Sequence, residues 1–302
     1  MVSLQQLKIS KAEDEIILGP HTDQSQTLDL KVRVILKLID GFDFWLRIPK
    51  NKLKIIKDAH KLLDTSVVML DDLDSKPIWS NTTNCSGYRN DGLAATLNAA
   101  NFAGCIAVNK SFELDHPEAI GIYVEQMLES YRGQAMEYDW RENLKCPTED
   151  EYRRMCIRKT GSFYYNSVRL MQLFSNDKSN FVKITEILAQ FFRIYEDYID
   201  LTQSSSEYCK NFSLGKFNFA VVHAINKYPE DVQLMNLIKQ RSADKKIHKY
   251  MMSLLEQFGS LEYTKETLII LRNEAEEEMK KFEYNPFIIE LLDDALSQFN
   301  IV

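Results

Sequence analysis

Glycine and proline are scarce along this chain, and this scarcity constrains its fold more than any other feature. The 302 residues include only 10 Gly and 7 Pro. The prolines fall mostly between stretches whose apolar residues recur with the period of an α-helix. Apolar residues make up 45% of the chain, which is enough for a sizeable core. The sequence therefore predicts an all-α protein.

Helix-like stretches follow one another with short connections, so residues 1–302 are expected to form a single domain. We expect a break at Gly41 and a loop over the polar segment 75–91. Thr148 and Glu151 have the spacing of a capping box. The stretches predicted to be helical are 28–46, 52–74, 91–114, 116–143, 146–175, 178–201, 216–227, 229–241, 244–257, 263–282 and 286–299.

The charge balance and the cysteines indicate which partners and which compartment to expect. The net charge of −7 argues against nucleic acid, because binding a phosphate backbone needs a basic surface. The five cysteines include no Cys-x-x-Cys pair, which is typical of reduced thiols in a cytoplasmic protein. No apolar run reaches the roughly 18 residues of a membrane span, and the N-terminus lacks a signal-peptide pattern. We expect a cytoplasmic protein without a membrane span.

Two acidic clusters each follow an apolar stretch. Their members are Asp71, Asp72 and Asp74 in the first cluster and Glu196, Asp197 and Asp200 in the second. Because a buried charge without compensation is very costly, a cation is the natural partner of such carboxylates. Oxygen ligands completed by water and phosphate are what Mg²⁺ prefers. The two clusters together predict a Mg²⁺ site, and the alternative is that each is a solvated helix end.

Several other side chains suit a diphosphate. Lys159 and Thr160 offer a positive charge and a hydroxyl group, and Lys216 lies at an expected helix start, where backbone N–H groups favour anions. The alternative for either lysine is an ordinary surface position. Aromatic side chains that suit a hydrocarbon chain lie nearby in sequence, and ordinary core packing is their alternative role: Phe163, Tyr165 and Phe192.

The order and spacing of several motifs resemble the isoprenyl diphosphate synthase family, in particular its animal geranylgeranyl diphosphate synthases. The resemblance extends over nearly the whole chain. It implies an isoprenoid synthase-type bundle of long helices around a deep cavity, and a homodimer. It also implies three Mg²⁺ ions, with Mn²⁺ as the alternative, on the diphosphate of a small allylic substrate. The motifs are DDLD (71–74), LNAANF (97–102), WRENLKCPTEDEY (140–152), KTG (159–161), LMQLFS (170–175), FFRIYEDYIDL (191–201), LGKFNFAVVHAI (214–225) and GSLEYT (259–264).

The resemblance also implies roles for individual residues. All six members of the two acidic clusters are expected to bind metal. The residues expected to take part in catalysis are Asp71, Asp72, Lys159 and Lys216. The residues expected to bind substrate are Arg33, Lys159, Thr160, Phe163, Tyr165, Phe192 and Lys216.

The chain departs from the family mainly in the groups that hold the second substrate, isopentenyl diphosphate. The family's Gly-Lys-x-x-Arg segment is DLKVR at 29–33, where only the arginine remains. Asp64 stands where the family has a histidine, and residues 78–82 lack the family's arginine pair. Ser75 replaces the last aspartate of the first motif. Each lost charge-assisted hydrogen bond is worth about 1.5–3 kcal/mol, so isopentenyl diphosphate should bind orders of magnitude more weakly.

This selective loss predicts a class I terpene synthase, similar to the insect terpene synthases that resemble prenyl diphosphate synthases. Without a second substrate, the allylic cation must lose a proton, cyclise or react with water. Two alternatives stay open: a chain-elongating prenyltransferase, and an inactive subunit that regulates such an enzyme. Tyr165 stands where the family usually has glycine, which predicts a shortened cavity that favours geranyl or farnesyl diphosphate, geranyl first. The product would be a monoterpene or a sesquiterpene, unless the ring faces a neighbouring helix or the dimer interface.

Overall fold

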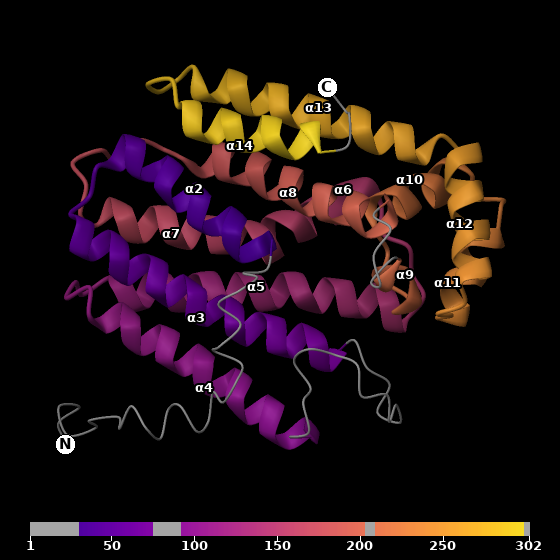
Figure 1. Cartoon of the computed structure of the whole chain (residues 1–302), viewed down its shortest axis with the longest axis horizontal. Coiled ribbons are helices and arrows are strands. Elements are labelled where there is room, and N and C mark those ends of the chain that lie inside the picture. Colours follow the sequence, from indigo (N-terminus) through magenta and orange to yellow (C-terminus); the bar gives the residue numbers. More distant parts are fainter. Residues whose placement is uncertain (1–29, 75–91, 203–208, 299–302) are drawn as a thin grey trace. The chain divides into compact units, whose positions relative to one another are not determined.

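The computed structural model describes residues 30–74, 92–202 and 209–298 (Figure 1). These ranges form helices and contain no β-strand, which confirms the predicted all-α fold. None of the described helices has the length and apolar character needed to cross a membrane. The helices are α2 Leu30–Leu46, α3 Lys50–Asp74, α4 Gly92–Phe112, α5 Ala119–Glu142, α6 Glu149–Cys156, η3 Ile157–Gly161, α7 Ser162–Gln172, α8 Val182–Thr202, α9 Lys210–Ser213, α10 Phe219–Lys227, α11 Gln233–Gln240, α12 Lys245–Gln257, α13 Ser260–Met279 and α14 Pro286–Ser297.

The chain divides into two compact units, and the boundaries between them fall within α2, just after its end and within α5. The first unit comprises Met1–Leu36 and Ile48–Ile120, and the second comprises Lys37–Arg47 and Gly121–Val302. The expectation that residues 1–302 form a single domain stays a prediction. The predicted loop over 75–91 lies outside the described residues.

In the first unit, α3 and α4 pack along each other (Figure 1). Small side chains on α4 allow this contact to be close. Met69 of α3 packs against Ala99 of α4. A Cβ atom added at Gly104 would lie 3.3 Å from Ser66 Oγ of α3. These contacts fix the last turns of α3, where Asp71 lies.

In the second unit, α8 contacts α6, η3, α7, α9, α10 and α13. Most of its side chains are therefore buried, including the fully buried Phe191 and Ile194. The second acidic cluster occupies the last turns of this helix. Its carboxylates consequently meet a partly desolvated environment, in which their partners determine whether they are charged.

α2 continues through Gly41, so the predicted break there is wrong. A Cβ atom added at Gly41 would lie 2.8 Å from Ile288 Cγ1 of α14. Asn285 Nδ2 donates a hydrogen bond to the Gly41 carbonyl at 2.8 Å, and the Asn285 side chain also caps α14. The glycine therefore permits close packing against α14 inside a continuous helix.

The stretch predicted as one helix over 146–175 is built from α6, η3 and α7 in succession. Its predicted capping box is confirmed: Thr148 N–H donates to Glu151 Oε2 at 2.8 Å, and Glu151 N–H donates to Thr148 Oγ1 at 3.2 Å. η3 is a π-helical turn from Ile157 to Gly161, and Lys159 lies inside it. Single π turns inside α-helices are frequent at functional sites.

Candidate functional site

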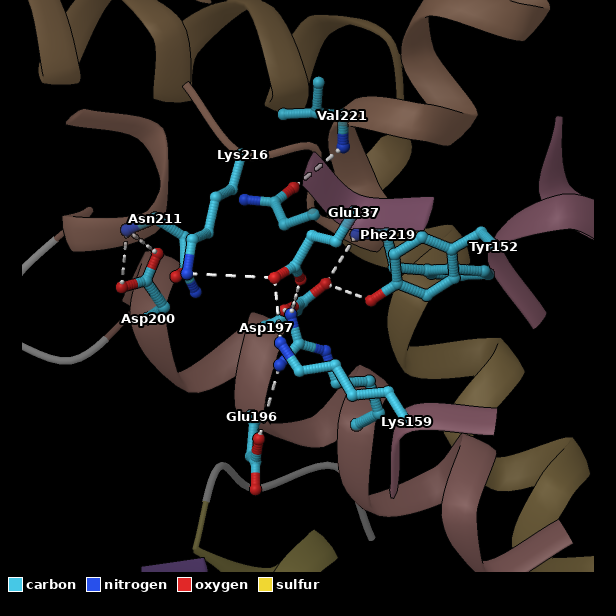
Figure 2. Close-up of polar contacts among 12 residues, drawn as sticks. Glu137, Tyr152, Lys159, Glu196, Asp197, Asp200, Asn211, Lys216, Phe219 and Val221 are labelled. Atoms are coloured by element: carbon cyan, nitrogen blue, oxygen red, sulfur yellow. Dashed lines mark hydrogen bonds and ion pairs between the residues drawn. The ribbon is translucent and has the colours of Figure 1, made fainter. Parts of the chain in front are cut away.

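The candidate site is the cluster of polar side chains around the second acidic cluster (Figure 2). Glu196, Asp197 and Asp200 share α8 but differ in exposure. The side chain of Glu196 is 21% exposed, and that of Asp197 is 2% exposed. Glu196 Oε2 lies 3.8 Å from Arg193 Nη1, one turn earlier on the same helix.

Asp197 contacts two helices that pack against α8. Its Oδ2 accepts hydrogen bonds from the Tyr152 hydroxyl and, at 2.8 Å, from the backbone N–H of Phe219 at the start of α10. Burial raises the pKa of the Asp197 carboxyl, while Arg193, with Nη2 3.6 Å from Oδ1, lowers it. Within residues 30–74, 92–202 and 209–298, Oδ1 accepts no hydrogen bond. Asp197 therefore joins α8 to α6 and α10 through one oxygen only.

Asp200 contacts the start of α9. Both of its carboxylate oxygens accept from the backbone N–H of Asn211 at 3.3 Å, and its carbonyl accepts from Cys209 N–H at 2.8 Å. Burial raises the pKa of the Asp200 carboxyl to about 7. A carboxyl in this state gains most from a nearby positive charge.

Glu137 of α5 is the centre of the basic part of the site, although no sequence motif pointed to it. It is 3% exposed. Its Oε2 accepts from Lys159 Nζ at 2.8 Å and lies 3.8 Å from Lys216 Nζ, while Oε1 accepts from Arg193 Nη2 at 2.9 Å (Figure 2). Burial alone would raise the pKa of Glu137, but the three cations hold it well below its usual range. Both lysines predicted to bind diphosphate thus meet at one buried carboxylate.

A signal for Glu137 was present in the sequence. On α5 the buried positions include Gln126, Ser130, Gly133, Glu137 and Trp140, which recur every three or four residues. A charged residue in that stripe needs a buried partner of opposite charge. Two further members of the cluster, Tyr152 and Arg193, were also missed because they lie within ordinary amphipathic patterns.

The other predicted substrate residues lie on several elements of the second unit. Thr160 is half-buried in η3. Phe163 and Tyr165 are half-buried on α7, and the Tyr165 ring lies 5.8 Å from the Arg169 guanidinium carbon. Phe192 is buried on α8, packed edge-on against the rings of its neighbours. Whether these rings contact substrate stays a prediction.

Arg33 and the first acidic cluster belong to the first unit. Arg33 is exposed on α2, and Asp71 is half-buried on α3. Asp72 and Asp74 belong to α3, but their side chains lie outside the described structure, as do Ser75 and residues 78–82. In the second unit, by contrast, Lys159, Lys216 and the second acidic cluster are brought together (Figure 2).

The carboxylates on α8 fit a hard divalent cation chemically. Oxygen donors that are partly desolvated suit Mg²⁺ or Mn²⁺, and Asp197 Oδ1 is a buried oxygen that accepts no hydrogen bond from any part of the chain that the structure describes. Among the side chains that the structure describes, no three of His, Cys, Asp and Glu are grouped so as to hold a metal ion. The fit of the α8 carboxylates to a divalent cation therefore rests on the chemistry of their oxygen atoms.

Comparison with known proteins identifies the family. The family model for polyprenyl synthetase matches residues 36–255. The chain belongs to the polyprenyl synthetase family. A protein of Matsumurasca onukii named terpene synthase is 40% identical to it over 288 residues, covering 94% of each chain. A geranylgeranyl pyrophosphate synthase of Aspergillus flavus is 36% identical over 244 residues, 79% of this chain and 71% of the fungal one. One of Penicillium crustosum is 37% identical over 252 residues, 82% and 73% of the two chains. The resemblance to isoprenyl diphosphate synthases is thus confirmed.

Proposed function

We propose that this polyprenyl synthetase family member is a class I terpene synthase. It would cleave the carbon–oxygen bond of geranyl or farnesyl diphosphate, and both bonding electrons would leave with the diphosphate. The allylic cation would then lose a proton, giving a monoterpene or a sesquiterpene. The observation that supports this best is the convergence of Lys159 and Lys216 on Glu137, which Arg193 links to the α8 carboxylate of Asp197, because a leaving diphosphate needs cations that are already in place.

Each group in the site has a proposed part. Lys159, Thr160 and Lys216 would donate hydrogen bonds to the diphosphate, and charge-assisted bonds of this kind are the strong ones. Arg33 would add a further cation. The rings of Phe163, Tyr165 and Phe192 would surround the hydrocarbon chain and exclude water from the cation. The released diphosphate would accept the proton, so no dedicated basic side chain is required.

Mg²⁺, or Mn²⁺ in its place, would be held by the carboxylates of the two acidic clusters. The proposed ligands are Asp71, Asp72, Asp74, Glu196, Asp197 and Asp200. When bound, three such ions would supply Lewis-acid stabilisation of the charge on the leaving group. Asp197 would contribute Oδ1, because its Oδ2 is occupied by Tyr152 and Phe219.

We favour a lyase over a transferase because other residues replace those with which the family binds isopentenyl diphosphate. Asp64 stands where the family has a histidine, so its negative charge would repel a second diphosphate, and the relative from Matsumurasca onukii is named terpene synthase. The second candidate is a chain-elongating prenyltransferase, which the names of the fungal relatives favour. The third is an inactive regulatory subunit.

One incubation separates the three candidates. The purified chain is mixed with Mg²⁺ and geranyl, farnesyl or geranylgeranyl diphosphate, each with and without isopentenyl diphosphate. We expect hydrocarbons from the first two substrates and no longer prenyl chains. Efficient incorporation of isopentenyl diphosphate would make the chain a prenyltransferase, and no turnover of any substrate would favour the regulatory subunit.

We further propose that the chain acts as a cytoplasmic homodimer. The resemblance implies the dimer, and α5 offers a surface for it. Four apolar or aromatic side chains recur there at helical spacing, and each is between 37% and 57% exposed: Val124, Leu128, Tyr131 and Tyr138. Side chains four, seven and fourteen residues apart lie on one face of a helix, so they can meet the same face of a second copy.

A further inference from the structure

One face of α5 contacts Lys159 at three successive levels. Ser130 Oγ donates to the Lys159 carbonyl at 3.4 Å, and Glu137 Oε2 accepts from Lys159 Nζ at 2.8 Å. Between them, Gly133 lies against the Lys159 backbone. Positions 130, 133 and 137 share one face of a helix because they are three and four residues apart. The backbone and the charged tip of Lys159 are thus both located by α5.

Gly133 is required by the closeness of this contact. A Cβ atom added there would lie 2.5 Å from Lys159 N and 2.8 Å from Lys159 Cα. No side chain fits against backbone at such distances, so the glycine lets the π turn of η3 rest directly on α5. By contrast, a Cβ atom added at Gly121, on the same helix, would meet nothing within 4 Å.

Glu137 completes the contact with charge. Without its carboxylate, the Lys159 and Lys216 ammonium groups and the Arg193 guanidinium would repel one another in a desolvated place (Figure 2). Lys159 and Arg193 donate to different oxygens of the carboxylate, so an amide at position 137 would turn its NH2 group, a donor, toward one of the two cations.

We propose that Glu137 is a positioning residue for diphosphate recognition, which acts by holding Lys159 where the diphosphate binds, with Gly133 setting the backbone. The inference rests on the proposed function in that Lys159 is taken to bind diphosphate. Glu137 itself does not touch the ligand. A lysine that is already placed loses less freedom on binding, so its hydrogen bond contributes more to affinity.

Whether one substitution strengthens or weakens the binding of an anion tests this role. Glu137→Gln makes the site more positive by one charge, so charge alone predicts tighter binding of an anion. Positioning predicts weaker binding, and we expect the affinity for inorganic pyrophosphate in Mg²⁺, measured by calorimetry, to fall about tenfold. The control is Glu142→Gln, the same change at an exposed arginine-paired position of α5, which should stay within twofold. Unchanged or tighter binding in Glu137→Gln would overturn the proposal.

A second pair of variants leaves every charge in place. Gly133→Ala should push Lys159 away and weaken pyrophosphate binding about tenfold, whereas Gly121→Ala should bind as the wild type does. If Glu137→Gln does not fold, as judged by circular dichroism, the glycine pair decides. Equal affinities for the two alanine variants would then contradict the proposal.

A double-mutant cycle asks whether Glu137 acts through Lys159. In a Lys159→Met background, Glu137→Gln should weaken binding by less than twofold, because the group that it positions is gone. Equal losses in both backgrounds would mean that Glu137 only supports the fold.

Turnover of prenyl diphosphates is measured separately: a wild type that binds pyrophosphate but turns over no substrate refutes the proposed function and not the positioning role. A wild type that does not bind pyrophosphate refutes the positioning role.

Discussion

At the scale of single residues, the carboxylates of α8 differ in what they contact. Glu196 pairs with Arg193 on its own helix, whereas Asp197 and Asp200 accept hydrogen bonds from the backbone of the segment after α8. Carboxylates of one motif therefore have different roles: one pairs with a cation of its own helix, and the other two accept from the backbone of later segments. Substitutions at these positions should accordingly have different effects on activity and on stability.

Glu196→Gln should reduce turnover while leaving the fold intact. The amide keeps the size of the side chain but loses the charge that a Mg²⁺ ligand supplies, so we expect turnover to fall on the order of 100-fold or more. Circular dichroism should be unchanged. Glu186→Gln, on the same helix, is the matched control, and activity within a few-fold of wild type in Glu196→Gln would argue against the metal assignment.

Tyr152→Phe should instead act on stability. It removes the hydroxyl that donates to the buried Asp197 carboxylate. A buried acceptor that loses one donor costs about 1–3 kcal/mol, which urea denaturation can measure as a drop in the free energy of unfolding. Tyr250→Phe removes an exposed hydroxyl and should change that free energy far less. Equal losses of unfolding free energy in the two variants would show that the buried hydrogen bond stabilises the fold no more than the exposed one does.

His60 of α3 should make stability depend on pH. It is buried, and burial lowers its pKa from 6.5 to about 4. A histidine that resists protonation in the folded state contributes stability above pH 6.5, and this stability is lost as the pH falls toward 4. From pH 7 to pH 5, the unfolding free energy should fall about 2 kcal/mol more in the wild type than in His60→Asn. Parallel pH profiles for the two proteins would contradict this.

At the scale of elements, the apolar periodicity predicted nearly every helix, because a 3.6-residue repeat of buried side chains is visible in sequence. It did not predict that α2 would run through Gly41, since the contact with Ile288 is made by a residue far away in the chain. Nor did it separate η3 from its neighbours or find the four-residue helix α9. The lysines and the acidic clusters were found from their motifs. The role of Glu137 could not be predicted in this way, because it depends on cationic partners that are known only from the structure.

α7 is the element expected to set the length of the substrate. Replacing Tyr165 by glycine removes a full ring, so Tyr165→Gly should raise the kcat/KM for geranylgeranyl diphosphate relative to geranyl diphosphate, on the order of tenfold. Tyr165→Phe keeps the ring and should leave the ratio unchanged. The argument fails if geranylgeranyl diphosphate is already the best substrate of the wild type.

At the scale of the whole molecule, the proposed homodimer should be sensitive to the exposed face of α5. The wild type should sediment at about 70 kDa, twice the 35.2 kDa of one chain. Leu128→Glu puts a charge into an apolar interface and should shift the protein toward monomer. Ile270→Glu, at a comparably exposed position of α13, should not. A wild type that is monomeric at all concentrations would refute the dimer.

Two hydrogen bonds also affect how this enzyme can be evolved in the laboratory: Phe219 N–H donates to Asp197, and Asn211 N–H donates to Asp200. Lys216 lies between Asn211 and Phe219 in the chain, so randomising position 197 or 200 would disturb the lysine proposed to bind substrate together with the proposed metal ligands. A library at position 196 should perturb the packing less, because the Glu196 side chain is 21% exposed whereas that of Asp197 is 2% exposed. We expect such a library to keep a high yield of folded variants, and it is the place to search for altered metal preference.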